Sequence, residues 1–312
     1  APLGGGYLDH IEHSVGKEYA GRLDAEYRFD AGILRSLSAG LRYTDRSAVT
    51  DSSTYAYYGT SARANDLYEV RKFRGDLYRG FQGVPQGAVF FDRYLVLDYD
   101  ATRQALAPYV DPSQRDALLN GVSYVPSDRN TQGEKTYTAY GVAKFDFVDA
   151  GFPLDGNIGV RVIKTKVSTD GFSVQTPQIQ LPSGPANGPI SYVPISVNSS
   201  YTKALPSINL RYHFTDQLQL RLAASKGLTR PDFSQLNPNI NIVELNPGSN
   251  IRTSSSGNPY LKPLEATQFD ASLEWYFSRT GSLYAAGFYK KVDGFIANIA
   301  TDETYDFGNG PF

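Results

Sequence analysis

One stretch decides the fold class: Ser207-Ile208-Asn209-Leu210-Arg211-Tyr212-His213-Phe214. Its even positions are apolar and its odd positions are polar. Two residues then turn the chain, and residues 217–225 alternate in the same way on the return. Strict alternation with a period of two places one strand face in an apolar medium and the other face in a polar one. The stretch therefore predicts a β-hairpin between two different media.

A soluble sandwich or jelly roll also alternates, so strand length and the chemistry of the polar face must decide between water and lipid. Soluble strands usually run about 5–6 residues, whereas a tilted membrane-spanning strand needs about 9–11. The alternating runs here reach the longer class, the polar face is charged along its length, and the apolar face ends in aromatics near the turns: Tyr212, Phe214, Trp275 and Phe277. This pattern is typical of an all-β, antiparallel transmembrane β-barrel with lipid outside and a watery lumen inside.

The same alternation predicts about eight strands in four hairpins, and the connections alternate between short and long. The long connections are expected at 46–135, 170–199 and 229–264, all at one end of the sheet. Outer-membrane barrels show this asymmetry, with short periplasmic turns and long extracellular loops. The first long loop exceeds the usual ceiling of about 15 residues for a structureless loop, so it should be folded. It contains a predicted helix with Asp111 as N-cap, Pro112 first and Gly121 past its end. Residues 1–18 show no period and are expected to end a loop.

Composition excludes several function classes. No run of about 20 apolar residues exists, which excludes a helical membrane protein. The absence of cysteine excludes disulfides and thiolate metal sites, and a net charge of −2 gives no reason to expect nucleic acid. The three histidines are His10, His13 and His213. We expect a lumen hydrogen bond for His213, and neither catalysis nor a metal site for any of them. The chain is therefore not predicted to be an enzyme, and no cofactor or metal is implied.

Two motifs carry a family resemblance. They are Ala224-Ser225-Lys226-Gly227-Leu228-Thr229-Arg230-Pro231-Asp232-Phe233 and Gly257-Asn258-Pro259-Tyr260-Leu261-Lys262-Pro263-Leu264. Together with residues 269–277 and 288–291, they resemble the barrel of TonB-dependent outer-membrane receptors, most closely the subgroup often associated with carbohydrate uptake. The likeness is strongest over residues 200–296. The loop residues that match the family motif are Arg230, Pro231, Phe233, Gly257, Asn258 and Pro259, and we expect the Pro and Gly among them to fix loop geometry.

The resemblance implies a 22-stranded barrel with an N-terminal plug domain, opened by the TonB complex of the inner membrane. About eight strands are visible, and no plug or closing C-terminal strand is found in the sequence, so residues 1–312 are expected to be part of a receptor barrel. The implied partners are a small solute (an oligosaccharide or a siderophore), outer-membrane lipid, and the TonB complex through a plug domain not present in this chain. The implied location is the bacterial outer membrane, and the implied function is energy-dependent import of a scarce nutrient.

Aromatic and charged side chains in the first long loop are the candidate ligand-binding residues. Sugar rings pack their C–H faces on aromatic planes, while Arg and Asp bind hydroxyl groups. The alternative is that these side chains pack the loop's own small core. The candidates are Tyr55, Tyr57, Tyr58, Tyr68, Arg71, Phe73, Asp76, Tyr78 and Arg79.

Several functions remain open from the sequence. A carbohydrate is the preferred solute and a ferric siderophore is the main alternative. A passive porin or small structural barrel of eight strands would account for the length, although it leaves the receptor-like motif and the long first loop unexplained. A secreted β-rich carbohydrate-binding protein or enzyme is disfavoured by the lipid-type strand pattern and by the lack of a catalytic carboxylate motif.

Overall fold

The computed structural model describes residues 5–61, 70–72, 89–91, 99–175, 178–182, 184–244 and 252–302. The chain divides into two compact units. The sheet unit comprises residues 14–50 and 129–312, and the loop unit comprises residues 1–13 and 51–128. Each unit is described by itself.

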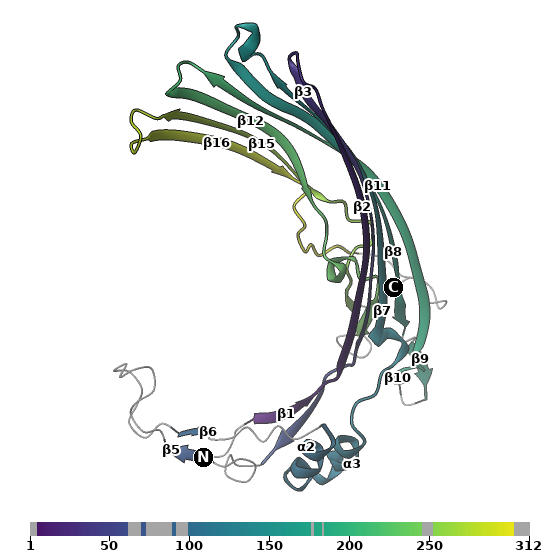
Figure 1. The fold of residues 1–312 in the computed structure, drawn as a ribbon. Coiled ribbons are helices and arrows are strands. Elements are labelled where there is room, and N and C mark those ends of the chain that lie inside the picture. Colours follow the sequence, from purple (N-terminus) through teal and green to yellow (C-terminus); the bar gives the residue numbers. More distant parts are fainter. Residues whose placement is uncertain are drawn as a thin grey trace. The chain divides into compact units, whose positions relative to one another are not determined.

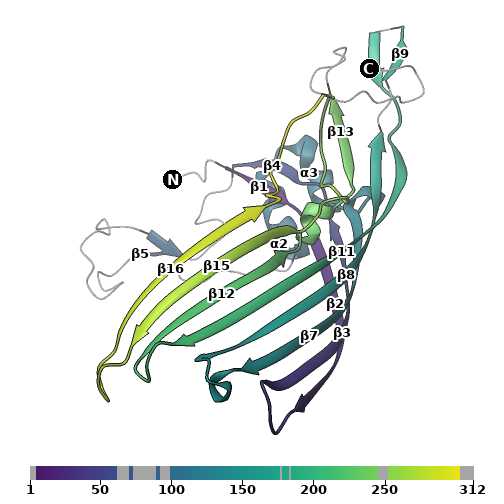
Figure 2. The same cartoon turned by 90° about the horizontal axis from the view of Figure 1, so that it is seen from above.

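The sheet unit is built from antiparallel strands in which neighbours in sequence are neighbours in space (Figures 1 and 2). Their order across the sheet is β16-β15-β12-β11-β8-β7-β3-β2. Their bounds are β2 Glu12–Arg28, β3 Leu34–Ser52, β7 Arg129–Asp146, β8 Leu154–Gln175, β11 Ser191–His213, β12 Leu218–Thr229, β15 Leu264–Trp275 and β16 Leu283–Asp293. The predicted all-β, hairpin-by-hairpin architecture is confirmed.

Strand register assigns every side chain to one of two faces, because residues directly opposite in an antiparallel pair share a face. Ile208 lies opposite both Ile158 and Ala224, which defines the apolar outer face. Arg211 lies opposite Asp155 and Arg221, which defines the polar inner face. These assignments match the predicted ones.

From the sequence alone, either set of alternating residues in the last strand could face lipid, and the strand register decides between the two sets. Leu283 lies opposite Trp275, and Tyr289 lies opposite Phe269. Trp275 and Phe269 belong to the outer face, so Leu283, Ala285 and Tyr289 face outward with them. Tyr284 and Phe288 therefore lie on the inner face of β16.

The strands extend well beyond the predicted ones, and this corrects two expectations. Residues 1–18 are not the end of a loop, because β1 (Gly5–Asp9) and residues 12–18 of β2 lie there. β3 continues to Ser52 and β7 begins at Arg129, so both reach into the connection predicted at 46–135. β8 and β11 likewise enter the connection predicted at 170–199. In the extensions of β2, β3 and β7 both faces are largely polar, so no alternation reveals the strand there.

The loop unit has a small core of its own. β1 pairs with β4 (Ala56–Thr60), and β5 (Val70–Lys72) pairs with β6 (Val89–Phe91). Helix α2 (Tyr99–Leu106) leads through the 3₁₀ turns η2 (Ala107–Tyr109) to α3 (Pro112–Asn120), and η3 (Pro126–Asp128) closes the unit. The core consists of Tyr58, Leu106, Ala107, Val110 and Leu118.

Helix α3 confirms the predicted helix at both ends. Its N-cap is Asp111, whose Oδ1 accepts the Ser113 backbone N–H at 2.8 Å, and Pro112 is its first residue. Gly121 ends it with φ +70°, a backbone conformation that favours glycine. Helix α2 was not predicted. Among the described residues, no helix has the length and apolar character needed to cross a membrane.

Short strands complete the long connections of the sheet unit. β9 (Gln178–Leu181) and β10 (Gly184–Asn187) form a hairpin. Between β12 and β15, the chain forms the 3₁₀ turn η5 (Phe233–Leu236) and the strand pair β13 (Ile240–Glu244) and β14 (Arg252–Ser255). β13 also pairs in parallel with the far end of β8, Ile240 opposite Ser173. This connection therefore folds back onto the sheet.

Candidate functional site on the inner face

Near the tight turns, the inner face is a wall of paired polar groups. Asp155 accepts from Arg211 Nε at 2.9 Å and lies 2.7 Å from His213 Nε2. Across the neighbouring strands, Glu274 accepts from Arg221 Nε at 2.9 Å. Asp155, Arg211 and Arg221 border a hollow of about 560 Å³ on this face. The lumen hydrogen bond expected for His213 is confirmed, and the charged side chains neutralise one another in a hydrophilic surface.

At the opposite end of the inner face, Arg230 fastens the connection between β12 and β15 to the sheet. We call residues 230–263 the motif loop. Arg230 Nη1 donates to Glu134 and, at 2.8 Å, to the hydroxyl of Thr136, both on β7. Glu134 also accepts from Arg46 Nε of β3 at 2.9 Å, and its side chain is only 2% exposed. One buried carboxylate is thus shared by two guanidinium groups from distant parts of the chain.

Aromatic and apolar contacts reinforce this attachment. The Arg46 guanidinium carbon lies 4.7 Å from the centre of the Phe233 ring, a cation–π contact. Leu236, at the end of the same 3₁₀ turn η5, is 2% exposed. Asp232 and Gln235 form a capping box around η5. The motif loop is therefore a packed element of the inner face.

The second half of the motif is held to the first by close backbone approach. Asn258 N–H donates to the Gln235 carbonyl at 2.8 Å, and the Pro259 carbonyl accepts the Ser199 hydroxyl at 3.3 Å. A Cβ on Gly257 would lie 2.6 Å from the Gln235 carbonyl oxygen, closer than real Cβ contacts. Only glycine fits there without moving the backbone. The motif residues thus shape the loop and join it to the sheet.

The candidate ligand-binding residues of the loop unit have different surroundings. Tyr55 and Tyr57 are 62% and 63% exposed, and Tyr55 stacks on His10 with ring centres 4.1 Å apart. Tyr58 is only 6% exposed and packs in the core of the unit. Arg71 lies in β5, although its side chain is outside the described residues, as are Tyr68, Phe73, Asp76, Tyr78 and Arg79. The described part of the set therefore presents two exposed aromatic rings.

A second polar network, absent from the predictions, lies inside the loop unit. Asp9 is 1% exposed and accepts from the Tyr99 hydroxyl at 3.1 Å and the Tyr7 hydroxyl at 3.4 Å. The Arg103 guanidinium carbon lies 4.1 Å from the centre of the Tyr99 ring. Burial, assisted by the nearby Asp9 carboxylate, raises the pKa of Tyr7 to about 12. This network joins β1 to α2.

Two residues of the inner face, Arg46 and Glu134, were also missed by sequence reasoning. Both lie within the connection predicted at 46–135, where no alternation marks the strands. The sequence points to them only through Arg230, which belongs to the family motif. The residues around Arg230 do not show that its partner is Glu134, 96 residues earlier. Among the described residues, no group of three or more His, Asp or Glu side chains is placed to hold a metal ion.

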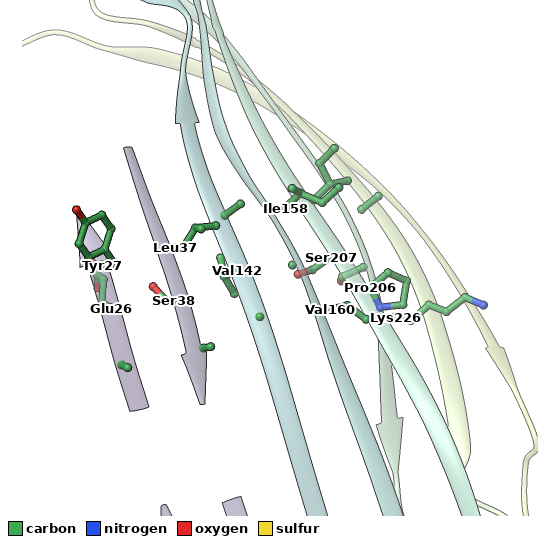
Figure 3. A pocket seen from close by; sticks show the side chains of 18 of the residues that line it. Glu26, Tyr27, Leu37, Ser38, Val142, Ile158, Val160, Pro206, Ser207 and Lys226 are labelled. Carbon is green, nitrogen blue, oxygen red and sulfur yellow. The ribbon is translucent and has the colours of Figure 1, made fainter. Parts of the chain in front are cut away.

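A further hollow, of about 1140 Å³, lies along the outer face (Figure 3). Its lining includes the apolar, outward-facing side chains of Leu37, Ile158, Val160 and Pro206. Polar side chains such as Glu26 and Lys226 also border this hollow, but most of its surface is apolar, which suits acyl chains better than a polar solute. The inner face and the exposed aromatics are therefore the better candidates for solute contact.

The barrel model for TonB dependent receptor-like proteins matches residues 4–310, nearly the whole chain. The chain belongs to the TonB-dependent receptor-like β-barrel family. This family forms barrels of the bacterial outer membrane and consists of receptors and transporters. The eight-stranded sheet of this TonB-dependent receptor-like chain is thus a section of a membrane barrel, with its apolar outer face toward lipid and its polar inner face toward the lumen.

Solved structures similar to this receptor-like chain share little sequence with it. The ferric yersiniabactin uptake receptor of Yersinia pestis is 12% identical with a TM-score of 0.45, over 91% of this chain and 30% of that one. The ferric-catecholate import receptor of E. coli is 13% identical with a TM-score of 0.48, over 96% of this chain and 33% of that one. The chain thus spans about a third of the length of these receptors. No curated protein matches it.

Proposed function

We propose that this chain is part of the barrel of an outer-membrane receptor that captures a scarce solute and imports it with energy from the TonB system. The observation that carries the proposal is the polar inner face of a membrane-barrel section that belongs to this family, with a packed loop folded onto it. A wall of paired charges suits a water-filled or plugged lumen. The energy-transducing complex would act through a plug domain to which no residue of this chain is assigned.

In this proposal the long connections between the strands capture the solute, and an oligosaccharide is the preferred solute. Tyr55, stacked on His10, and the exposed Tyr57 present flat aromatic surfaces suited to the C–H face of a sugar ring. Hydroxyl groups of the sugar would then bond to polar side chains nearby. No covalent step and no cofactor are needed for such binding.

A ferric siderophore is the second candidate, and uptake measurements distinguish the two. Bacteria that produce the whole receptor are supplied with labelled oligosaccharides or with labelled ferric chelates, with the TonB complex present or deleted. The proposal expects TonB-dependent uptake of an oligosaccharide, and loss of affinity in a Tyr55→Ala, Tyr57→Ala variant. TonB-dependent uptake of a ferric chelate alone would replace the carbohydrate with a siderophore. Uptake that persists without the TonB complex would refute energy-dependent import and favour a passive porin.

A further inference from the structure

Three lysines gather on the outer face, immediately beyond its apolar part. Lys135 of β7 lies directly opposite Lys166 of β8, and Tyr137 lies opposite Lys164. Tyr137 and Lys135 belong to the outer-facing positions of β7, so all three lysines point away from the lumen. Directly opposed residues have Cβ atoms about 5 Å apart, and like charges in such pairs destabilise a sheet. The arrangement therefore calls for a counter-charge.

The described protein offers only part of that counter-charge. Asp45 Oδ2 lies 3.6 Å from Lys135 Nζ. Among the described residues, no ion pair involves Lys164 or Lys166, and both side chains are exposed. The three lysines and Asp45 together therefore carry a net charge of two positive units. On the other side of β8, Ser200 of β11 lies opposite Lys166 and Thr202 lies opposite Lys164, so two hydroxyl groups share the same outer patch.

The position of the patch along β8 places it at the boundary of the membrane. The ten residue-to-residue steps from Leu154, at the hairpin end, to Lys164 advance about 33 Å along a strand, or about 25 Å along the membrane normal at a tilt of about 40°. The apolar band of an outer-membrane barrel is also about 25 Å tall. The three lysines therefore lie where the hydrocarbon ends, on the side of the long connections.

Aromatic side chains mark the same boundary. The rings of Tyr43 and Tyr137 lie 5.2 Å apart on the outer face, and Lys166 Nζ is 5.9 Å from the centre of the Tyr137 ring. Tyrosine is enriched where a membrane meets water, since its ring is apolar and its hydroxyl is polar. Lysines beside such a belt reach headgroups rather than acyl chains.

We propose that Lys135, Lys164 and Lys166, with the hydroxyls of Ser200 and Thr202, bind a phosphate group of the phosphorylated glycolipid in the outer leaflet of the membrane. The proposal rests on the proposed function, because it needs the long connections to lie at the outer surface. The ammonium groups neutralise the phosphate, and the hydroxyls donate to its remaining oxygens. The lipid supplies the charge that the opposed lysines lack, and it anchors this side of the barrel to its leaflet.

The test is native mass spectrometry of the whole receptor, purified in detergent and titrated with lipid A, the phosphorylated anchor of that glycolipid. A Lys164→Gln, Lys166→Gln variant should bind lipid A about 30-fold more weakly, because each lysine near an anionic lipid surface strengthens binding about fivefold. The matched control is Lys144→Gln, Lys290→Gln. It removes the same charge from inner-face positions of β7 and β16 and should bind like the unchanged protein.

Two further titrations identify the group that is recognised. Dephosphorylated lipid A should bind the unchanged receptor and the Lys164→Gln, Lys166→Gln variant equally weakly, whereas inorganic phosphate should compete with lipid A only for the unchanged receptor. Equal affinity of both proteins for lipid A, or equal loss in the inner-face control, would overturn the proposal. TonB-dependent uptake is measured on the same variants. Its absence in the unchanged receptor would refute the proposed function, and its presence without the lipid effect would refute the lipid site alone.

Discussion

Replacing Glu134 with glutamine should release the motif loop from the sheet. The carboxylate is 2% exposed and is shared by Arg46 and Arg230, so its loss leaves two guanidinium groups without their common anion. Removing one partner of a fully buried ion pair costs about 3–5 kcal/mol. Both arginine side chains are 30% exposed, which allows water to replace part of the lost interaction. We therefore expect local opening of the loop to become easier by about 2 kcal/mol.

A change of this size corresponds to hydrogen exchange that is about 30-fold faster for amides protected only by the closed loop. Two such amides are Asn258 N–H, which donates to Gln235, and Phe172 N–H, which donates to Asn239 Oδ1 at 2.8 Å. Exchange measured by mass spectrometry on peptides covering these residues, in the receptor embedded in lipid, reports the opening directly. Heat-modifiable mobility on a gel checks that the barrel itself has formed.

The matched control is Glu274→Gln, which removes the same charge at the turn end of the inner face. Glu274 pairs with Arg221, Gln219 and Tyr276, which all lie outside the motif loop, so exchange at Asn258 and Phe172 should stay unchanged. If Glu134→Gln changes that exchange by less than twofold while the barrel remains intact, the buried carboxylate does not hold the loop.

Three further changes test other parts of the structure. Leu222→Arg, on the outer face, should cost about 2–4 kcal/mol and reduce insertion into lipid vesicles, whereas Ala223→Arg on the inner face should insert normally; equal yields would contradict the assigned faces. Hydrogen bonds from Ser113 lower the pKa of Asp111, so its capping of α3 is fully present above a pH of about 4 and is lost as the pH falls through the lower folded-state value. Asp111→Asn should remove this acid dependence of helix content measured by hydrogen exchange, and an unchanged dependence would assign it elsewhere. Tyr7 has a pKa raised to about 12, above about 10 in the unfolded chain, so its contribution to the loop unit is complete below pH 10 and disappears as the pH rises toward 12. Tyr7→Phe should flatten the loss of stability over that interval, as followed by proteolysis of the loop unit, and a loss that stays the same would contradict this cause.

The hairpins and their faces were predictable from the sequence because lipid and lumen impose opposite chemistry on successive residues. Ile208, Leu210 and Tyr212 could be assigned outward without any knowledge of their neighbours, and the register places them so. Helix α3 was predictable for a different reason, since its cap residues act within a few positions of one another. Both predictions rest on interactions that are local in sequence.

The attachment of the motif loop was not predictable in this way. Arg230 bonds to Glu134 and Thr136, which precede it by 96 and 94 residues, and the second strand contributing to the cluster, β3, ends still earlier in the chain. The sequence shows an arginine in a motif but not the carboxylate that it meets. The partner becomes known only when the order of β3, β7 and β8 and their register bring the inner-face residues together.

The error in strand length has a physical cause that also explains the lysine patch. Apolar and polar residues alternate only where the two faces of a strand meet different media. The alternation therefore disappears where a strand leaves the hydrocarbon, although backbone pairing continues. On β8 the outer-facing residues are Ile158, Val160 and Val162 and then Lys164, and the pairing with β11 runs on to Gln175. The sequence thus predicts the part of each strand that lipid surrounds, and the point where the prediction ended is the membrane boundary itself. Lys164 follows the apolar Val162 on this face and lies beside Lys166, which is the position at which we propose a phosphate contact.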